Sequence, residues 1–187
     1  MDKKQYRVTI QWSLALLLIL LLFNLNRNLY ASELTPPVKA PQVDFISQGQ
    51  SHTLSEYQGK KTMLWLFSTW CHTCAAGVKA LTDKQSEWER NGLVILALRN
   101  YKNGGYPGPN VEEFISHYSS SSSNNWVKGE ASKVMNEQFN SRQYPDIYFL
   151  IDEQGFIQEK GTAPAVFIQK IIDFAQSKTI KAKEKSK

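Results

Sequence analysis

The sequence is poor in cysteine, with only two in 187 residues, Cys71 and Cys74. None is left over for disulfides that would join distant parts of the chain, so the domain must be held by its hydrophobic core. A hydrophobic content of 42%, with 12% aromatic residues, is ample for such a core. A disulfide within so short a loop adds little stability. The cysteine pair is therefore either reactive or part of a metal site.

Metal ligands are scarce as well. The three histidines, His52, His72 and His117, are scattered, and there is no second Cys-x-x-Cys. A structural zinc site usually needs four ligands, which makes zinc binding the weaker alternative. Covalent haem attachment needs a histidine directly after the second cysteine, where this chain has Ala75. We therefore expect no metal and no cofactor.

Unbalanced charge is confined to one end of the chain. The formal net charge is +5, and residues 178–187 carry five lysines against Glu184, a net +4. The remainder is nearly balanced and offers no basic face for nucleic acid. We interpret residues 178–187 as a solvated basic tail, with weak attraction to anionic lipid as the alternative.

The longest apolar run lies near the N-terminus. Residues 1–31 start with Lys3, Lys4 and Arg7 and continue into an unbroken apolar stretch at 14–23. That stretch is shorter than the roughly 20 residues of a membrane span. We predict a signal peptide, cleaved after Ala31, or an uncleaved membrane anchor. Both place the rest of the chain outside the cytoplasm, because the positive end stays inside.

Residues 32–42, which contain three prolines, are predicted to form an extended linker, and a folded domain is predicted over 43–177. The apolar run at 62–67 lacks alternation, which is typical of a central strand covered on both faces. A helix is predicted over 71–90 and a second buried strand over 93–98. Together they predict a βαβ unit with parallel strands.

The remaining elements are assigned from turn and capping signals. They are a helical turn within 51–59, a helix over 111–118 capped by Asn110, a short edge strand at 126–127, a helix over 130–139, a strand at 147–151 paired with 156–157 in a hairpin, and a last helix capped by Thr162.

The order of these elements resembles the thioredoxin fold, an α/β fold with a central mixed sheet flanked by helices. The segment from His52 to Lys60 and the Trp70-Cys71-His72-Thr73-Cys74 motif resemble the TlpA/ResA-like exported thioredoxin-like proteins. The Tyr144-Pro145 pair, with the apolar strand and hairpin after it, is similar to that family's cis-proline loop. The resemblance covers about residues 43–176. A thioredoxin-like domain that supplies electrons to exported methionine sulfoxide reductases is also similar.

The chemistry of the pair follows from its place at the start of a helix. Unpaired backbone N–H groups and the helix dipole favour the thiolate of Cys71, which we predict to be the nucleophile. Cys74, one turn on and more buried, is predicted to resolve the mixed disulfide. Trp70, His72 and Thr73 are candidates for tuning the redox potential, although an exposed His72 would have little effect.

Tyr144 and Pro145 are the predicted substrate-binding residues. The resemblance implies a cis Pro145 against the cysteines, with the backbone of residues 143–144 offered to an extended substrate. The alternative is a proline that merely starts a strand.

Two acids of related proteins are missing. Thioredoxin-like reductants often keep a buried acid six residues before the first cysteine, where this chain has Trp65. Some ResA-like proteins carry an acid three residues after the second cysteine, where this chain has Gly77. Another group, or water, is therefore expected to move the proton of Cys74.

The sequence thus predicts an exported thiol–disulfide oxidoreductase that reduces disulfides in extracytoplasmic proteins. Such a reductant needs a membrane partner that passes electrons outward. Candidate substrates are apocytochrome c, oxidised extracytoplasmic proteins and a methionine sulfoxide reductase. The alternatives are a disulfide oxidant or isomerase, or a non-catalytic interaction module with the same fold.

Overall fold

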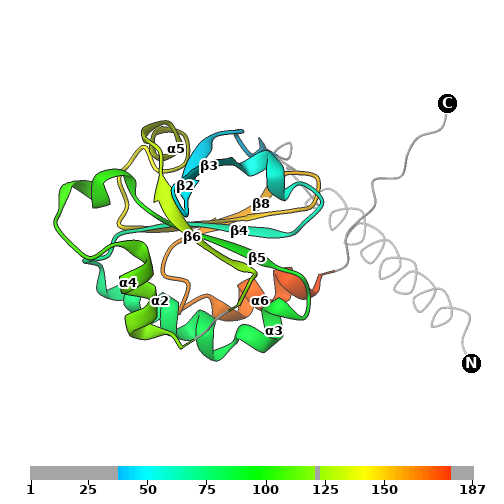
Figure 1. The fold of residues 1–187 in the computed structure, drawn as a ribbon. Helices are drawn as coiled ribbons and strands as arrows, with labels where there is room; N and C mark the ends of the chain where they lie inside the picture. Colours follow the sequence, from blue (N-terminus) through cyan, green and yellow to red (C-terminus); the bar gives the residue numbers. More distant parts are fainter. Residues whose placement is uncertain (1–37, 121–122, 178–187) are drawn as a thin grey trace, which may run out of the picture. The chain divides into compact units, whose positions relative to one another are not determined.

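The computed structural model of the protein describes residues 38–120 and 123–177 (Figure 1). The predicted signal or anchor segment, most of the predicted linker and the basic tail lie outside these residues. Within the part of the chain that is described, no helix is long and apolar enough to cross a membrane.

One mixed sheet of eight strands forms the centre, in the order β1-β8-β7-β4-β5-β6-β2-β3. Strands β4, β5 and β6 pair in parallel, and β7 pairs antiparallel with β4. The strands are β1 (Val38–Lys39), β2 (Asp44–Ser47), β3 (Gln50–Thr53), β4 (Thr62–Phe67), β5 (Val94–Arg99), β6 (Trp126–Ala131), β7 (Asp146–Ile151) and β8 (Phe156–Gly161).

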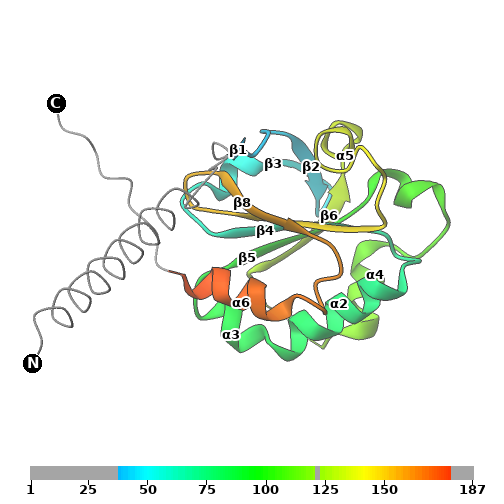
Figure 2. The ribbon, with the colours of Figure 1, turned by 180° about the vertical axis from the view of Figure 1, so that it is seen from behind.

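The helices cover both faces of the sheet, as Figures 1 and 2 show: α2, α3, α4 and α6 lie on one face, and α5 lies on the other. Their bounds are α2 (His72–Asp83), α3 (Gln85–Glu89), α4 (Val111–Tyr118), α5 (Lys133–Phe139) and α6 (Ile168–Gln176), with short 3-10 helices η1 (Leu54–Tyr57) and η2 (Tyr101–Gly105). This arrangement confirms the predicted thioredoxin-like class of fold.

Strand β4 is buried along its whole length and divides the core in two. Met63, Trp65 and Phe67 contribute to the cluster under α2, α3, α4 and α6, whereas Leu64 and Leu66 contribute to the cluster under α5. Alternate residues of a strand point to opposite faces. The run at 62–67 is therefore apolar throughout because both faces are covered, as predicted. Each fully buried side chain of this size contributes about 1.5–3 kcal/mol.

The predicted βαβ unit is present as β4, α2 and β5. The single helix predicted over 71–90 is in fact two, because Lys84 leaves helical geometry (φ −104°, ψ 12°) between α2 and α3. The predicted cap of α4 is confirmed: the side chain of Asn110 accepts a hydrogen bond from the backbone N–H of Glu113 at 2.8 Å.

The sheet is larger than predicted on both sides. Residues 126–131 form a full interior strand, not a short edge strand, because the unpredicted β2–β3 hairpin adds beyond them. Gly129 permits this, since a Cβ there would collide with the backbone carbonyl of Ile46. At the opposite edge, Val38–Lys39 pair with β8, so the sheet begins inside the predicted linker.

Two helix starts were also predicted wrongly. Helix α5 begins at Lys133, after Glu130 and Ala131 have ended β6, and it is capped by Ser132, whose hydroxyl accepts the N–H of Met135 at 3.0 Å. Helix α6 begins only at Ile168, after a turn over 164–167, so Thr162 is not its cap.

Candidate functional site

The cysteine pair lies after the central strand β4, where the chain enters helix α2. Cys71 is the N-cap of α2, Cys74 stands in its first turn, and the two are joined as a disulfide with their Cα atoms 5.2 Å apart. The backbone N–H of Cys74 points at the sulfur of Cys71, 3.3 Å away. Cys71 is 7% exposed and Cys74 is fully buried, which agrees with the predicted difference between them. An unpaired N–H group of the first helical turn is thus directed at the more accessible sulfur.

The two residues between the cysteines are both exposed and differ in what they contact. The hydroxyl of Thr73 lies 3.0 Å from the sulfur of Cys71. His72 is the first residue of α2, on its exposed side. Thr73 therefore contacts the reacting sulfur of Cys71 directly, and tuning of the redox potential by His72 stays a prediction.

Trp70 is held by the loop that follows β5. Its indole N–H donates to the backbone carbonyl of Asn103 at 2.8 Å, and its ring lies 4.9 Å from that of Tyr106. The side chain of Asn103 in turn accepts the N–H of Thr69 at 2.9 Å. Asn103 adopts a left-handed conformation (φ 55°), which asparagine tolerates better than most residues. Trp70, 41% exposed, therefore presents a fixed aromatic edge beside Cys71.

Pro145 lies against the pair, as predicted, but in the other isomer. Its carbonyl accepts the N–H of Ser68 at 2.8 Å and lies 3.2 Å from the sulfur of Cys74. No peptide bond among the described residues is cis, so the prediction of a cis Pro145 was wrong. The trans isomer is the intrinsically preferred one. Gln143, in the left-handed region (φ 55°), turns the chain into β7.

Two buried asparagines hold the loop before Pro145. Asn140 accepts the N–H of Tyr144 at 2.8 Å and donates to the carbonyl of the same residue at 2.7 Å. Asn140 also donates to Asn100 at 2.9 Å, and Asn100 donates to Ser68 at 3.0 Å. Because the backbone groups of Tyr144 are already bonded internally, they do not form the open edge predicted for an extended substrate. The ring of Tyr144 remains 38% exposed.

A buried carboxyl group that the sequence did not single out lies next to the pair. Asp146 is only 4% exposed, and one of its carboxylate oxygens lies within 4.8 Å of both cysteine sulfurs. Its Oδ1 accepts the indole N–H of Trp65 at 2.8 Å, and its Oδ2 is buried without a hydrogen-bond partner. Burial raises the pKa of Asp146, and the polar groups of Trp65, Thr73 and the Ala163 backbone around the carboxyl oppose that rise. The available signal was an acid at the first position of an apolar strand, directly after Pro145.

The structure explains why positions 65 and 77, where related proteins carry an acid, hold tryptophan and glycine in this chain. The indole of Trp65 fills the space beside α2, so a Cβ on Gly77 would lie 2.9 Å from its Cζ2 atom. A larger side chain at position 77 would collide with that ring. The carboxyl group reaches the pair from β7 instead, in the form of Asp146.

Cys71, Cys74 and Asp146 are also the one group in the described chain with metal-type donor atoms close together. The two sulfurs are bonded to each other and offer no thiolate. Three donors also fall short of the four that a structural zinc site uses. We assign no metal site to them.

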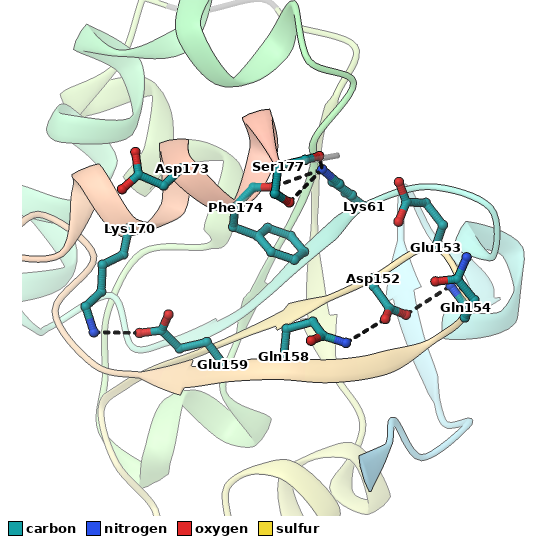
Figure 3. A pocket seen from close by; sticks show the side chains of 10 residues that line it. All are labelled: Lys61, Asp152, Glu153, Gln154, Gln158, Glu159, Lys170, Asp173, Phe174 and Ser177. Atoms are coloured by element: carbon teal, nitrogen blue, oxygen red, sulfur yellow. Dashed lines mark hydrogen bonds and ion pairs between the residues drawn. The ribbon is translucent and has the colours of Figure 1, made fainter. Parts of the chain in front are cut away.

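A cavity of about 530 Å³ lies at the other end of β4 (Figure 3). Buried Lys61, just before β4, donates there to the carbonyls of Phe174 and Ala175 at 3.0 Å and also bonds to Ser177. Lys170 pairs with Glu159 at 3.0 Å across the same cavity. These contacts fasten the end of α6 to the sheet, and the cavity is remote from the cysteines.

A redox-capable Cys-x-x-Cys pair at a helix start, on a thioredoxin fold, defines a thiol–disulfide oxidoreductase. The chain belongs to the AhpC/TSA family, whose model matches residues 33–160. It is 28% identical over 120 residues to the thiol-disulfide oxidoreductase ResA of Geobacillus thermodenitrificans, covering 62% of this chain and 67% of that protein. It is 28% identical over 156 residues to the thioredoxin-like protein YneN of Bacillus subtilis, covering 80% and 88%.

A solved structure shares the fold. The thiol:disulfide interchange protein, a thioredoxin family protein from Chlorobium tepidum, superposes with a TM-score of 0.59 at 18% identity, over 75% of this chain and 97% of that one. The predicted resemblance to ResA-like proteins of thioredoxin fold is thereby confirmed.

Proposed function

We propose that the protein is an exported reductant of protein disulfides, with Cys71 as nucleophile and Cys74 as resolving cysteine. The observation that carries the proposal is the asymmetry of the pair. Cys71 caps α2 and is partly accessible, whereas Cys74 is fully buried behind it. Only one sulfur can therefore meet a protein substrate, and it is the one that the helix N-terminus stabilises as a thiolate.

The reaction transfers two electrons to the substrate. The thiolate of Cys71 attacks a substrate disulfide, forms a mixed disulfide and releases the first substrate thiolate. The thiolate of Cys74 then attacks the sulfur of Cys71 and releases the second. The protein is left with the Cys71–Cys74 disulfide. A membrane partner of the dithiol class returns the two electrons.

Exposed aromatic rings support a polypeptide substrate. Trp70 and Tyr106 stand on one side of Cys71, with exposed fractions of 41% and 61%. Tyr144 precedes Pro145, which touches Cys74. A cavity of about 360 Å³, lined by η2, α5 and residues up to Gln143, continues this surface. Aromatic rings beside a cleft suit the side chains that flank a substrate disulfide.

Two features of the sequence support the proposed direction of electron flow and the proposed location outside the cytoplasm. Thr73 precedes Cys74 at a position where related oxidants often carry a histidine, which favours a reductant. Residues 1–31 have the charge and apolar pattern of an export segment. Oxidised extracytoplasmic proteins, apocytochrome c and a methionine sulfoxide reductase remain the candidate substrates.

The reduction potential of the Cys71–Cys74 pair tests the direction of electron flow. A potential near that of thioredoxin, about −270 mV, is expected, and one near −120 mV would identify an oxidant instead. The measurement equilibrates the full chain with glutathione or dithiothreitol redox buffers and quantifies the free thiols.

Substrate trapping tests the roles of the cysteines. The Cys74→Ser variant should accumulate mixed disulfides through Cys71 when it is expressed in the source cell. The matched Cys71→Ser variant should trap nothing. Equal blanks from both variants would refute the catalytic roles. A reporter joined after Gln42 should be active outside the cytoplasm, and activity inside it would refute export.

A further inference from the structure

The resolving step needs a proton acceptor that neither familiar position supplies. Cys74 must lose its proton before it attacks Cys71, and it is fully buried from solvent. Its sulfur contacts the carbonyl of Pro145 at 3.2 Å, and a carbonyl can accept a hydrogen bond but cannot keep the proton. The positions of the usual acids hold Trp65 and Gly77. A base must therefore reach Cys74 from elsewhere.

We propose that Asp146 accepts the proton of Cys74 in the resolving step, and that Trp65 and Thr73 are its positioning residues. The proposal rests on the proposed function only for the order in which the two cysteines act. It assigns the acid–base role to a residue of β7, directly after the proline, and gives Trp65 a part in the chemistry.

The geometry places Asp146 within reach of the proton. Its carboxylate lies within 4.8 Å of both sulfurs, a separation that a small side-chain movement or one bridging water can span. Trp65 fixes Oδ1 at 2.8 Å and leaves Oδ2 buried with no partner. An unpaired carboxylate oxygen in a buried site is costly to maintain. The free oxygen is the one available to take the proton.

The surroundings of Asp146 suit a proton acceptor for a thiol. The titratable groups that face it are Cys71 and Cys74 from α2 and Tyr148 from β7. No cationic side chain is among the groups that act on its carboxyl. Burial raises the pKa of Asp146 toward that of a thiol. Transfer between groups of more similar pKa is less uphill.

The polar groups around Asp146 oppose that rise in its pKa. The indole of Trp65 and the hydroxyl of Thr73 both stabilise the charged form. They keep the carboxyl ionised, and therefore able to act as a base, at a pH where burial alone would leave it protonated. Thr73 also contacts the sulfur of Cys71 at 3.0 Å, so the same hydroxyl acts on the nucleophile and on the carboxyl group.

The step balances as follows in the reducing direction. The proton of the Cys74 thiol passes to Oδ2 of Asp146, and the resulting thiolate attacks the sulfur of Cys71. The bond between Cys71 and the substrate sulfur breaks, and that sulfur leaves with the electron pair. Asp146 then returns its proton to the departing thiolate or to solvent.

A chromogenic aromatic disulfide, dithiobis(nitrobenzoate), separates the two steps. The fully reduced, full-length protein should release one coloured thiolate as Cys71 attacks and a second as Cys74 resolves the mixed disulfide. Rates of both phases are measured by stopped flow from pH 5.5 to 9. The Asp146→Asn variant removes the base and keeps the size of the side chain. The matched control is Asp83→Asn, which replaces an exposed acid at the end of α2, the helix that carries Cys74.

In Asp146→Asn, the second phase should slow by about tenfold or more near neutral pH, while the first stays within about twofold. The difference should shrink as the pH approaches about 8.5, where a thiol ionises unaided. Asp83→Asn should match the unmodified protein in both phases. An unchanged second phase, or equal slowing of both phases, would overturn the proposal. Loss of the first phase in the unmodified protein would instead refute the role of Cys71.

The Trp65→Phe variant tests the same idea with the carboxyl group in place. Loss of the indole N–H should raise the pKa of Asp146. The acidic limb of the second-phase profile should then move to higher pH, with the rate on the alkaline side retained. A profile that keeps its midpoint would overturn the positioning role. This variant also decides the matter if Asp146→Asn fails to fold, which near-ultraviolet circular dichroism would reveal.

Discussion

Replacing Gly77 with alanine should harm the protein, although alanine is the better helix former. Glycine in a helix interior is less stable than alanine by roughly 0.5–1 kcal/mol. The new Cβ, however, would lie 2.9 Å and 3.0 Å from two ring carbons of Trp65, and 3.6 Å from Pro164. The ring is fully buried and fastened to Asp146, so it cannot swing aside freely. Overpacking of this kind costs about 1–3 kcal/mol. The expected net change in the free energy of unfolding is a loss of up to about 2.5 kcal/mol.

The same substitution should change sign when Trp65 is phenylalanine. The shorter ring removes the atoms that the Cβ would meet, and the helix preference of alanine remains. In that background Gly77→Ala should stabilise by about 0.5–1 kcal/mol, which implies a coupling energy of about 1–3 kcal/mol between the two sites.

Urea unfolding of the four oxidised full-length proteins, followed by circular dichroism, measures this coupling. The denaturant dependence must be alike in all four for the comparison to hold. If Gly77→Ala stabilised both backgrounds equally, the indole of Trp65 would not occupy the space beside position 77. The explanation for the missing acids would then fail with it.

Three further substitutions test other parts of the structure. The stability of Asp146→Asn relative to the unmodified protein should be higher at neutral than at acidic pH in thermal melts. The pKa of Asp146 is raised in the folded state, so its carboxyl group contributes less stability to the unmodified protein as the pH rises from its unfolded pKa through its folded one. A stability difference that stays constant with pH would contradict this. Lys61→Met should cost about 1–3 kcal/mol in urea unfolding, because it removes the hydrogen bonds of a buried ammonium to the carbonyls of Phe174 and Ala175. Lys170→Met, at an exposed ion pair, should cost under about 1 kcal/mol, and equal losses from the two variants would contradict this. Asn140→Ala should slow reduction of insulin more than reduction of a small disulfide, because it frees the loop of Tyr144; equal slowing would contradict it.

The sequence was most informative where local pattern decides structure. The apolar run at 62–67 and the helix start at Cys71 follow from burial on two faces and from capping, which depend on near neighbours. The β2–β3 hairpin was missed because its turn is made by Gln48 and Gly49, both with positive φ, where the usual signal is Asn-Gly. Strand β6 was cut short because Lys128, Gly129 and Glu130 make its sequence polar.

The parts of the site that the sequence did not reveal depend on contacts between distant segments. Asn100 and Asn140 are ordinary loop and helix-end residues until the sheet brings them together under Tyr144. Asp146 becomes significant only through the register of β7, which sets it opposite Phe67 at the end of β4. No spacing in the sequence encodes that register, whereas the Cys-x-x-Cys spacing is local and could be read directly.

Trp65, Gly77 and Asp146 are best understood as one structural solution. The indole of Trp65 leaves room only for glycine at position 77, and its buried N–H needs a hydrogen-bond acceptor. Asp146 is that acceptor, and the bond in turn holds the carboxyl beside the cysteines. Moving the acid to position 77 by a single Gly77→Glu change would force a carboxyl against the ring while leaving Asp146 in place. Two acids would then compete for one buried space. Moving the acid to another position therefore requires all three residues to change together. Trp65 carries no acid itself, but its presence goes with an acid at position 146.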